Sequence, residues 1–143
     1  MTPTPTDEDY RRLLELRTGL RRFLRWSEHQ ARTAGITPAQ HQLLLAIRGN
    51  ADPRGPTIRD VADSLLLRHH SAVELVDRAA AAGLVERGQD PDKLSVVRLR
   101  LTDKGLAQLA ELSDLHLQEL AHLAPTMHAL WDALEHSGDQ RFS

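Results

Sequence analysis

Cysteine is absent from the 143-residue chain, and aromatic residues make up only 3% of it. The first absence excludes disulfides, thiolate nucleophiles and cysteine-based zinc or redox sites. The second means that a core rests on Leu, Ala, Val and Ile, of which Leu and Ala favour helices. No apolar run is long enough to span a membrane, and the N-terminus lacks the basic and apolar regions of a secretory signal. We therefore expect a mainly α-helical, cytoplasmic protein that forms one domain or one compact subunit.

Neither sign of charge is in large excess, because the net charge is −2. The charges are unevenly placed, however: residues 48–104 hold 10 of the 18 basic residues and 9 of the 20 acidic ones, so this part carries +1 and the remainder −3. A mildly basic centre gives weak support for a surface that faces phosphate.

Apolar residues recur at helical spacing in both terminal parts of the chain. One long helix is predicted over residues 7–34 from Leu13, Leu16, Leu20 and Leu24. A fifth helix is predicted from residue 103, and we expect Pro125 to break it and a short sixth helix to run from Thr126 to Glu135. Residues 1–6 are expected to be a disordered tail and residues 137–143 a second tail.

Three shorter helices and a β-hairpin are predicted between the terminal helices. Thr37 and Thr57 are expected to cap the second and third helices, and a fourth helix opens at "RHH", residues 68–70, and ends at Gly83. The apolar period then changes from 3.6 to 2, which predicts strands at "LVER" and "VVRLRLT" joined by the turn "GQDPDKLS". In the second strand one face holds Val97, Leu99 and Leu101, and the other holds Val96, Arg98 and Arg100.

This order of elements is that of a winged helix-turn-helix, and residues 57–105 resemble the MarR (multiple antibiotic resistance regulator) family. The resemblance is carried by five short motifs, which are Ile36-Thr37-Pro38-Ala39-Gln40, Val61-Ala62, Leu75-Val76-Asp77-Arg78, Gly83-Leu84-Val85 with Asp90, and Leu99-Arg100-Leu101-Thr102 with Gly105. It implies a mainly α fold with a small hairpin wing, in which residues 37–102 form the DNA-binding region. Residues 7–34 and 103–136 then form a helical dimerisation region.

The resemblance also implies a function. A two-fold homodimer would place two recognition helices about one DNA turn, ~34 Å, apart on a pseudo-palindromic operator. Such a protein would regulate transcription, as a repressor relieved by a small-molecule effector bound where Trp26, His29 and His41 converge. The expected DNA contacts come from the start of the fourth helix and from the wing: Arg54, Arg68, His69, His70, Ser71, Val73, Glu74, Lys93, Arg98 and Arg100.

Three positions depart from the family pattern. The wing's acid and its minor-groove arginine are replaced by Lys93 and Ser95, and Glu74 stands where an arginine is common. These departures motivate an alternative hypothesis, in which a degenerate winged-helix dimer acts as a protein-interaction module without specific DNA binding.

Metal binding and catalysis find little support in the sequence. His69 and His70 are adjacent and therefore point about 100° apart on a helix, which does not suit one metal ion. Ser71, His70 and Asp77 do not share a helix face, so they do not form a nucleophilic triad. We expect no enzyme, no metal and no cofactor.

Overall fold

The computed structural model describes residues 4–142 and contains five helices and one antiparallel hairpin. The elements are α1 (Asp7–Thr33), α2 (Pro38–Arg48), α3 (Ile58–Leu65), α4 (His69–Ala81), β1 (Val85–Gln89), β2 (Val97–Leu101) and α5 (Asp103–Phe142). The predicted fold class, mainly helical with a β-hairpin wing, is confirmed. The chain separates into two compact units, the winged unit (Glu28–Ser113) and the helix-pair unit (Met1–Ser27 with Asp114–Ser143).

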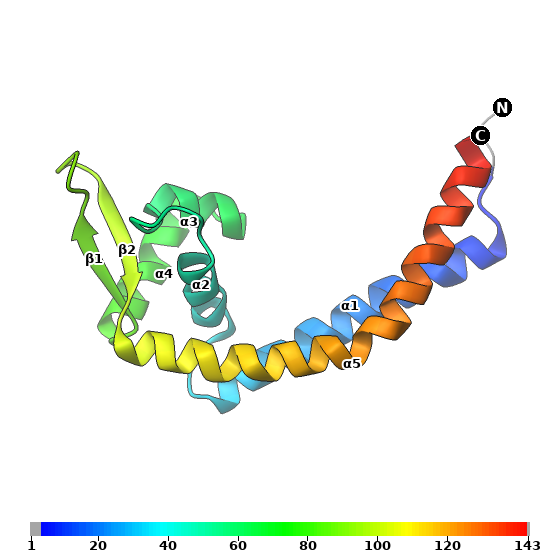
Figure 1. Cartoon of the computed structure of the whole chain (residues 1–143), viewed down its shortest axis with the longest axis horizontal. Coiled ribbons are helices and arrows are strands. Elements are labelled where there is room, and N and C mark those ends of the chain that lie inside the picture. Colours follow the sequence, from blue (N-terminus) through cyan, green and yellow to red (C-terminus); the bar gives the residue numbers. More distant parts are fainter. Residues whose placement is uncertain (1–3, 143) are drawn as a thin grey trace. The chain divides into compact units, whose positions relative to one another are not determined.

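The winged unit packs α2, α3 and α4 beside the hairpin (Figure 1). Leu43 and Leu44 of α2, Val76 of α4 and Leu99 of β2 are fully buried in its core. Leu109 and Leu112 of α5 belong to the same cluster. Aliphatic side chains therefore supply the core, as expected for a chain so poor in aromatic residues.

Capping boxes fix where α2 and α3 begin. The Thr37 hydroxyl accepts from the Gln40 N–H at 3.0 Å while the Gln40 side chain accepts from the Thr37 N–H. Thr57 and Asp60 exchange the same two bonds at the start of α3. Each cap satisfies N–H groups that have no partner within the helix, a contribution of about 1 kcal/mol.

The helix-pair unit holds the first part of α1 beside the last part of α5 (Figure 1). Asp9 of α1 accepts from the Ser137 hydroxyl at 3.0 Å and forms an ion pair with Arg141. Arg12 donates to the same Ser137 oxygen at 3.0 Å. A backbone hydrogen bond from Thr6, with the Ser137 and Arg141 contacts, holds the pKa of Asp9 well below its usual range.

The expected break at Pro125 and the tail after Glu135 are wrong, because α5 runs without interruption to Phe142. A proline inside a helix costs about 3 kcal/mol. The apolar face continues through it, since Leu123, Met127 and Leu130 lie on one side of α5 against α1. These contacts and the polar bonds to Asp9 keep the last turns helical. Ser143 lies outside the described residues.

The expected N-terminal tail is shorter than residues 1–6. Thr6 caps α1 by accepting from the Asp9 N–H at 3.2 Å, and Asp9 accepts from the Thr6 N–H at 2.8 Å. Residues 1–3 lie outside the described part of the chain. Among residues 4–142, no helix is sufficiently long and apolar to cross a membrane.

Replacing Gly105 with alanine is expected to lower the free energy of unfolding by at least about 2 kcal/mol, because the new Cβ would clash with neighbouring backbone atoms. It would lie 2.1 Å from the Leu84 carbonyl oxygen, which is backbone and cannot rotate away. Chemical denaturation at one protein concentration measures the change. Gly138→Ala is the matched control, since a Cβ there meets nothing within 4 Å. It should be neutral or stabilise the helix by up to about 1 kcal/mol, and equal effects of both variants would contradict this explanation.

Candidate nucleic-acid interface

The fourth helix presents its first turn to solvent. Its inner face is buried through Ala72, Val76 and Ala79, each with no exposed surface. A sharp turn from α3 precedes it, in which Leu66 adopts a left-handed conformation with φ 57° and the Leu67 N–H donates to the Ala62 carbonyl. The turn sets the direction in which α4 leaves α3.

The predicted contact residues of α4 fall into two groups. Arg68, His69, His70 and Glu74 are exposed, whereas Ser71 and Val73 are half-buried. The first three side chains therefore form the most accessible part of the helix start.

The start of α4 has no side-chain cap, unlike the starts of α2 and α3. Arg68 occupies the N-cap position and makes no capping hydrogen bond with its side chain. The first N–H groups of a helix have no partner within it, and the helix dipole adds a partial positive charge there. An uncapped and exposed helix start is well suited to an anionic partner such as a phosphate.

The wing is the hairpin of β1 and β2, with Gln89 opposite Val97 and Val85 opposite Leu101. Its tip carries Lys93 and Ser95, both exposed, and Arg100 is exposed further along β2. Lys93 and Arg100 are thus cations on the wing that a partner can reach.

Arg98 is half-buried, although alternation places it on the same face of β2 as the exposed Arg100. Its side chain is only 14% exposed, and its Nε donates to Asp90 at 2.8 Å. Its Nη1 donates to the Gly55 carbonyl at 3.2 Å. A carboxylate buried beneath the strand draws the guanidinium inward, because burying a charge requires a partner.

Asp90 is the centre of an ion-pair network at the base of the wing. The carboxylate is 2% exposed, accepts from the Asp92 N–H at 2.8 Å and lies 3.5 Å from Arg54. Arg54 also pairs with Asp52 at 2.9 Å. The backbone bond from Asp92, followed by the bond from Arg98, lowers the pKa of Asp90, and hydrogen bonds from Arg54 lower the pKa of Asp52 to about 2.

The role of Asp52 and the burial of Asp90 were missed from the sequence. Asp90 was noted only as part of a family motif, although its eight-residue separation from Arg98 is what a hairpin brings together. Asp52 gave no signal, because its partners come from its own loop and from β2. A second ion pair joins Asp77 of α4 to Arg87 of β1 and so links the helix to the wing.

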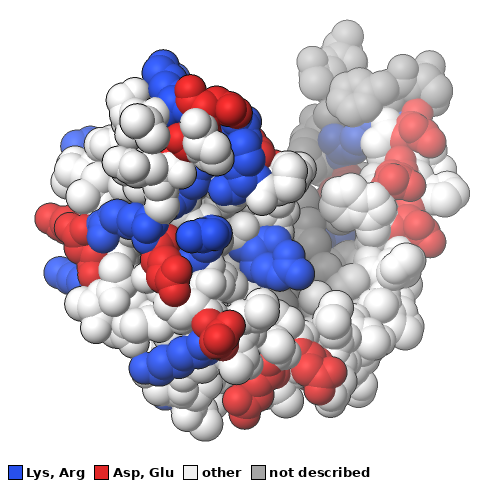
Figure 2. Space-filling model, turned by 60° about the vertical axis from the view of Figure 1, so that its left-hand side comes forward, with Lys and Arg blue, Asp and Glu red and all other residues white. Residues whose placement is uncertain are grey.

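Charges of both signs are interspersed over the winged unit on the face drawn in Figure 2. Lys and Arg side chains on that face are separated by Asp and Glu side chains, in keeping with a central part that carries only +1. Any anion-binding surface here is therefore local, and it depends on a few well-placed cations and helix N–H groups.

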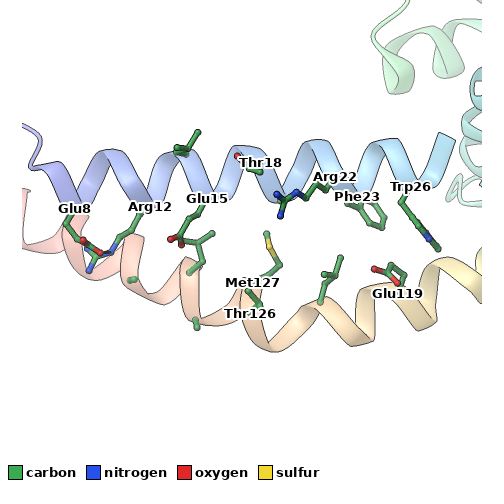
Figure 3. Close-up of a pocket in the computed structure, with 16 residues that line it drawn as sticks. Glu8, Arg12, Glu15, Thr18, Arg22, Phe23, Trp26, Glu119, Thr126 and Met127 are labelled. Carbon is green, nitrogen blue, oxygen red and sulfur yellow. Dashed lines mark ion pairs between the residues drawn. The ribbon is translucent and has the colours of Figure 1, made fainter. Parts of the chain in front are cut away.

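A groove of about 1110 Å³ lies between α1 and α5 of the helix-pair unit. Figure 3 shows Phe23 and Trp26 of α1 and Met127 of α5 pointing into it. The Trp26 ring also packs edge-on against His116, with the ring centroids 4.8 Å apart.

His29 and His41, which were predicted to share an effector site with Trp26, do not line this groove. They belong to the winged unit, where His29 is exposed and His41 is buried. The effector site stays a prediction, with Trp26 as its member in the groove. Within residues 4–142, no group of three or more His, Asp or Glu side chains is arranged to hold a metal ion.

The arrangement defines the chain as a winged helix-turn-helix protein, with α3 and α4 as the helix-turn-helix and β1–β2 as the wing. Residues 34–93 match the model of the MarR family. The matched segment is therefore similar to the MarR family, and it lies in the winged unit. No curated protein matches the chain significantly.

Solved structures with the same fold cover most of the chain. A MarR family transcription regulator is 20% identical, with a TM-score of 0.74 over 94% of this chain and 87% of that one. The transcriptional repressor CouR, bound to a 23-mer DNA duplex, is 27% identical, with a TM-score of 0.66 over 87% of this chain and 89% of that one. A mutant MarR from E. coli, complexed with operator DNA, is 22% identical, with a TM-score of 0.67 over 90% and 91% of the two chains.

Replacing Asp90 with asparagine is expected to loosen the wing, because Arg98 loses the charge that holds it inward. Hydrogen exchange of the β1 and β2 amides should quicken and the melting temperature should fall. Folding lowers the pKa of both Asp90 and Asp52, so their stabilisation is present above about pH 4 and is lost as pH falls towards the folded-state values. The stability of the Asp90→Asn variant should therefore depend less on pH below about 4.

Asp92→Asn is the matched control, because that side chain is 83% exposed and lies 3.9 Å from Arg54. It should leave exchange in the hairpin unchanged. Equal protection of the hairpin in the parent protein and the Asp90→Asn variant would show that the network does not hold the wing.

Proposed function

We propose that the protein is a homodimeric transcription regulator that binds double-stranded DNA in a sequence-specific manner and acts as a repressor. The observation that carries this proposal is the exposed, uncapped start of α4 with Arg68, His69 and His70. A helix fits the major groove, and its first residues reach the base edges there. Two of the similar structures, CouR and the mutant E. coli MarR, are bound to DNA.

Different residues have different parts in the proposed complex. Arg68, His69 and His70 donate to base edges or phosphates, and the half-buried Ser71 and Val73 limit how closely the helix approaches. Glu74 can accept from the amino group of cytosine, which favours particular bases. Lys93 and Arg100 contact the DNA backbone from the wing, whereas Arg54 and Arg98 position the wing through Asp90.

Relief of repression is assigned to the groove of the helix-pair unit. Its lining is mainly apolar, with Phe23, Trp26 and Met127. It also carries charges of both signs, which are Arg12, Arg22, Glu8, Glu15 and Glu119. An aromatic anion suits this combination, since the ring can stack on Trp26 and the charge can meet Arg22.

The groove can be tested with 1-naphthoate and a Trp131→Phe variant, in which Trp26 is the remaining tryptophan. Titration should change the emission of Trp26 in a saturable way and should weaken DNA binding. The converse variant, Trp26→Phe, keeps Trp131, which does not line the groove, and its emission should not respond. An unchanged Trp26 signal at millimolar ligand would rule out the groove as a site for this class of effector.

DNA binding is tested by titrating the protein against the duplex upstream of its own gene and against a scrambled duplex, at several salt concentrations. We expect the upstream duplex to bind at least about 1,000-fold more tightly. We also expect log K to fall linearly with log salt, as phosphate contacts release counterions. Equal and weak binding of both duplexes at low salt would favour the alternative, a protein-interaction module.

The double variant His69→Ala, His70→Ala should weaken specific binding by about 10- to 100-fold, the range for losing one good base contact. His122→Ala with His128→Ala is the matched control, because both side chains are exposed on α5 in the other unit. If the two double variants bind alike, the contacts assigned to His69 and His70 are wrong.

A further inference from the structure

The loop that joins β1 to β2 carries an exposed leucine at the tip of the wing (Figure 1). Leu94 is 70% exposed and lies between the exposed Lys93 and Ser95. A single exposed leucine is ordinary on a protein surface. The position of this one is unusual, because Gly, Pro, Asn, Asp and Ser are the residues that dominate tight turns.

Leu94 occupies a corner of a hydrogen-bonded turn. The Val96 N–H donates to the Lys93 carbonyl at 2.9 Å, which closes a β-turn with Leu94 and Ser95 as its central residues. The Asp90 N–H donates to the Val96 carbonyl at 2.9 Å and ties this turn to the base of the wing. The fold therefore fixes the backbone that carries the leucine.

The ion-pair network beneath the wing supports this turn. Asp90 accepts from the Arg98 Nε and from the Asp92 N–H, both at 2.8 Å. Arg98 in turn donates to the Gly55 carbonyl at 3.2 Å. Polar contacts thus join the tip to the loop before α3, and a side chain held on such a stiff support keeps its position when it meets a partner.

The charges beside Leu94 do not favour a phosphate. Asp92 and Lys93 are both exposed and have opposite signs, so they offset each other at the tip. Arg98 of β2 is engaged with Asp90. Contact with the phosphate backbone therefore gains little here, whereas removal of the Leu94 side chain from water is favourable.

We propose that Leu94 enters the minor groove of DNA as a wedge between two base pairs and kinks the duplex there. The inference rests on the proposed function and adds a deformation of the operator to it. With α4 in the major groove, the wing beside it reaches the adjacent minor groove. That groove is about 6 Å wide, which admits an aliphatic side chain. Leucine is among the side chains that proteins insert between base pairs in this way.

DNA suits this tip better than a protein partner does. A stable protein interface buries roughly 1,200 Å² or more in total, and it needs an apolar centre larger than one side chain between Lys93 and Ser95. A wedge needs only one apolar side chain. The tip also continues the interface proposed for the start of α4, because the hairpin and α4 are packed on the same core.

A wedge makes the wing sensitive to sequence without hydrogen bonds to the bases. Pyrimidine–purine steps such as TA and CA unstack most easily, so the operator should carry one where each Leu94 enters. Replacing that step by a stiff A-tract should weaken binding of the parent protein, and it should weaken binding of a Leu94→Ala variant much less.

Duplexes labelled with 2-aminopurine locate the wedge, because this base becomes more fluorescent when it is unstacked. The label is moved along the duplex upstream of the gene, in complex with the full chain. The parent should raise the emission at two positions, one on each side of the operator centre. Energy transfer between dyes on the two ends of the duplex should report a kink of about 20° or more.

Leu94→Ala should abolish both signals, whereas Leu94→Met keeps a long apolar side chain and should retain them. Leu45→Ala is the matched control, because Leu45 is 55% exposed on α2 of the same unit. It should leave the emission and the kink unchanged. Thermal melting confirms folding, and each substitution of an exposed leucine should change stability little.

The outcomes distinguish this inference from the proposed function. Specific binding to a duplex that stays straight and stacked would overturn the wedge and leave the regulator intact. A kink that Leu94→Ala retains would do the same. Failure of the parent to bind the upstream duplex at low salt would overturn both.

Discussion

The close approach of strand β2 to the loop before α3 fixes the geometry of the winged unit. The Leu99 N–H donates to the Pro56 carbonyl at 2.9 Å, and the Leu99 side chain is fully buried. Gly55 makes this possible. Its φ of +85° is one that residues with a side chain rarely adopt. A Cβ at this position would also lie 2.3 Å from the Leu99 carbonyl oxygen, so other residues are excluded. Because the core that buries Leu99 also buries the inner face of α4, the wing and the helix start that we propose to read DNA are built on one rigid base.

The ion-pair network extends the same constraint towards the tip of the wing. Arg98 joins the buried Asp90 to the Gly55 carbonyl, so a charged side chain continues the contact that Leu99 begins. The network also limits what the wing can offer a partner. With Arg98 turned inward, the accessible cations of the hairpin are reduced to Lys93 and Arg100 among the residues predicted to touch DNA. A wing of low charge leaves more of the recognition to α4.

Sequence patterns predicted the features that depend on local interactions, and they failed where tertiary contacts determine the structure. The order of elements and the hairpin followed from the change of apolar period and from Thr37, Thr57 and Gly83. The break expected at Pro125 is absent, because packing of α5 along α1 offsets the backbone hydrogen bond that the proline removes. The burial of Arg98 was missed for a related reason. Alternation predicts an exposed face where solvent covers one side of a strand, whereas Asp90 and the loop at Gly55 cover that side of β2 here. The partners of Arg98 come from two segments whose meeting is a property of the fold.

A net charge of −2 is compatible with DNA binding because charge is distributed by unit and by face. In the proposed homodimer, dilute protein reports the product of two steps, dimerisation and DNA contact, and salt weakens the second. Only well above the dimer dissociation constant does the salt dependence count phosphate contacts alone. Among the residues predicted to touch DNA, the exposed cations without an ion pair are Arg68, Lys93 and Arg100. That slope should therefore be shallow, and specificity should rest more on base contacts by α4 than on the phosphate backbone.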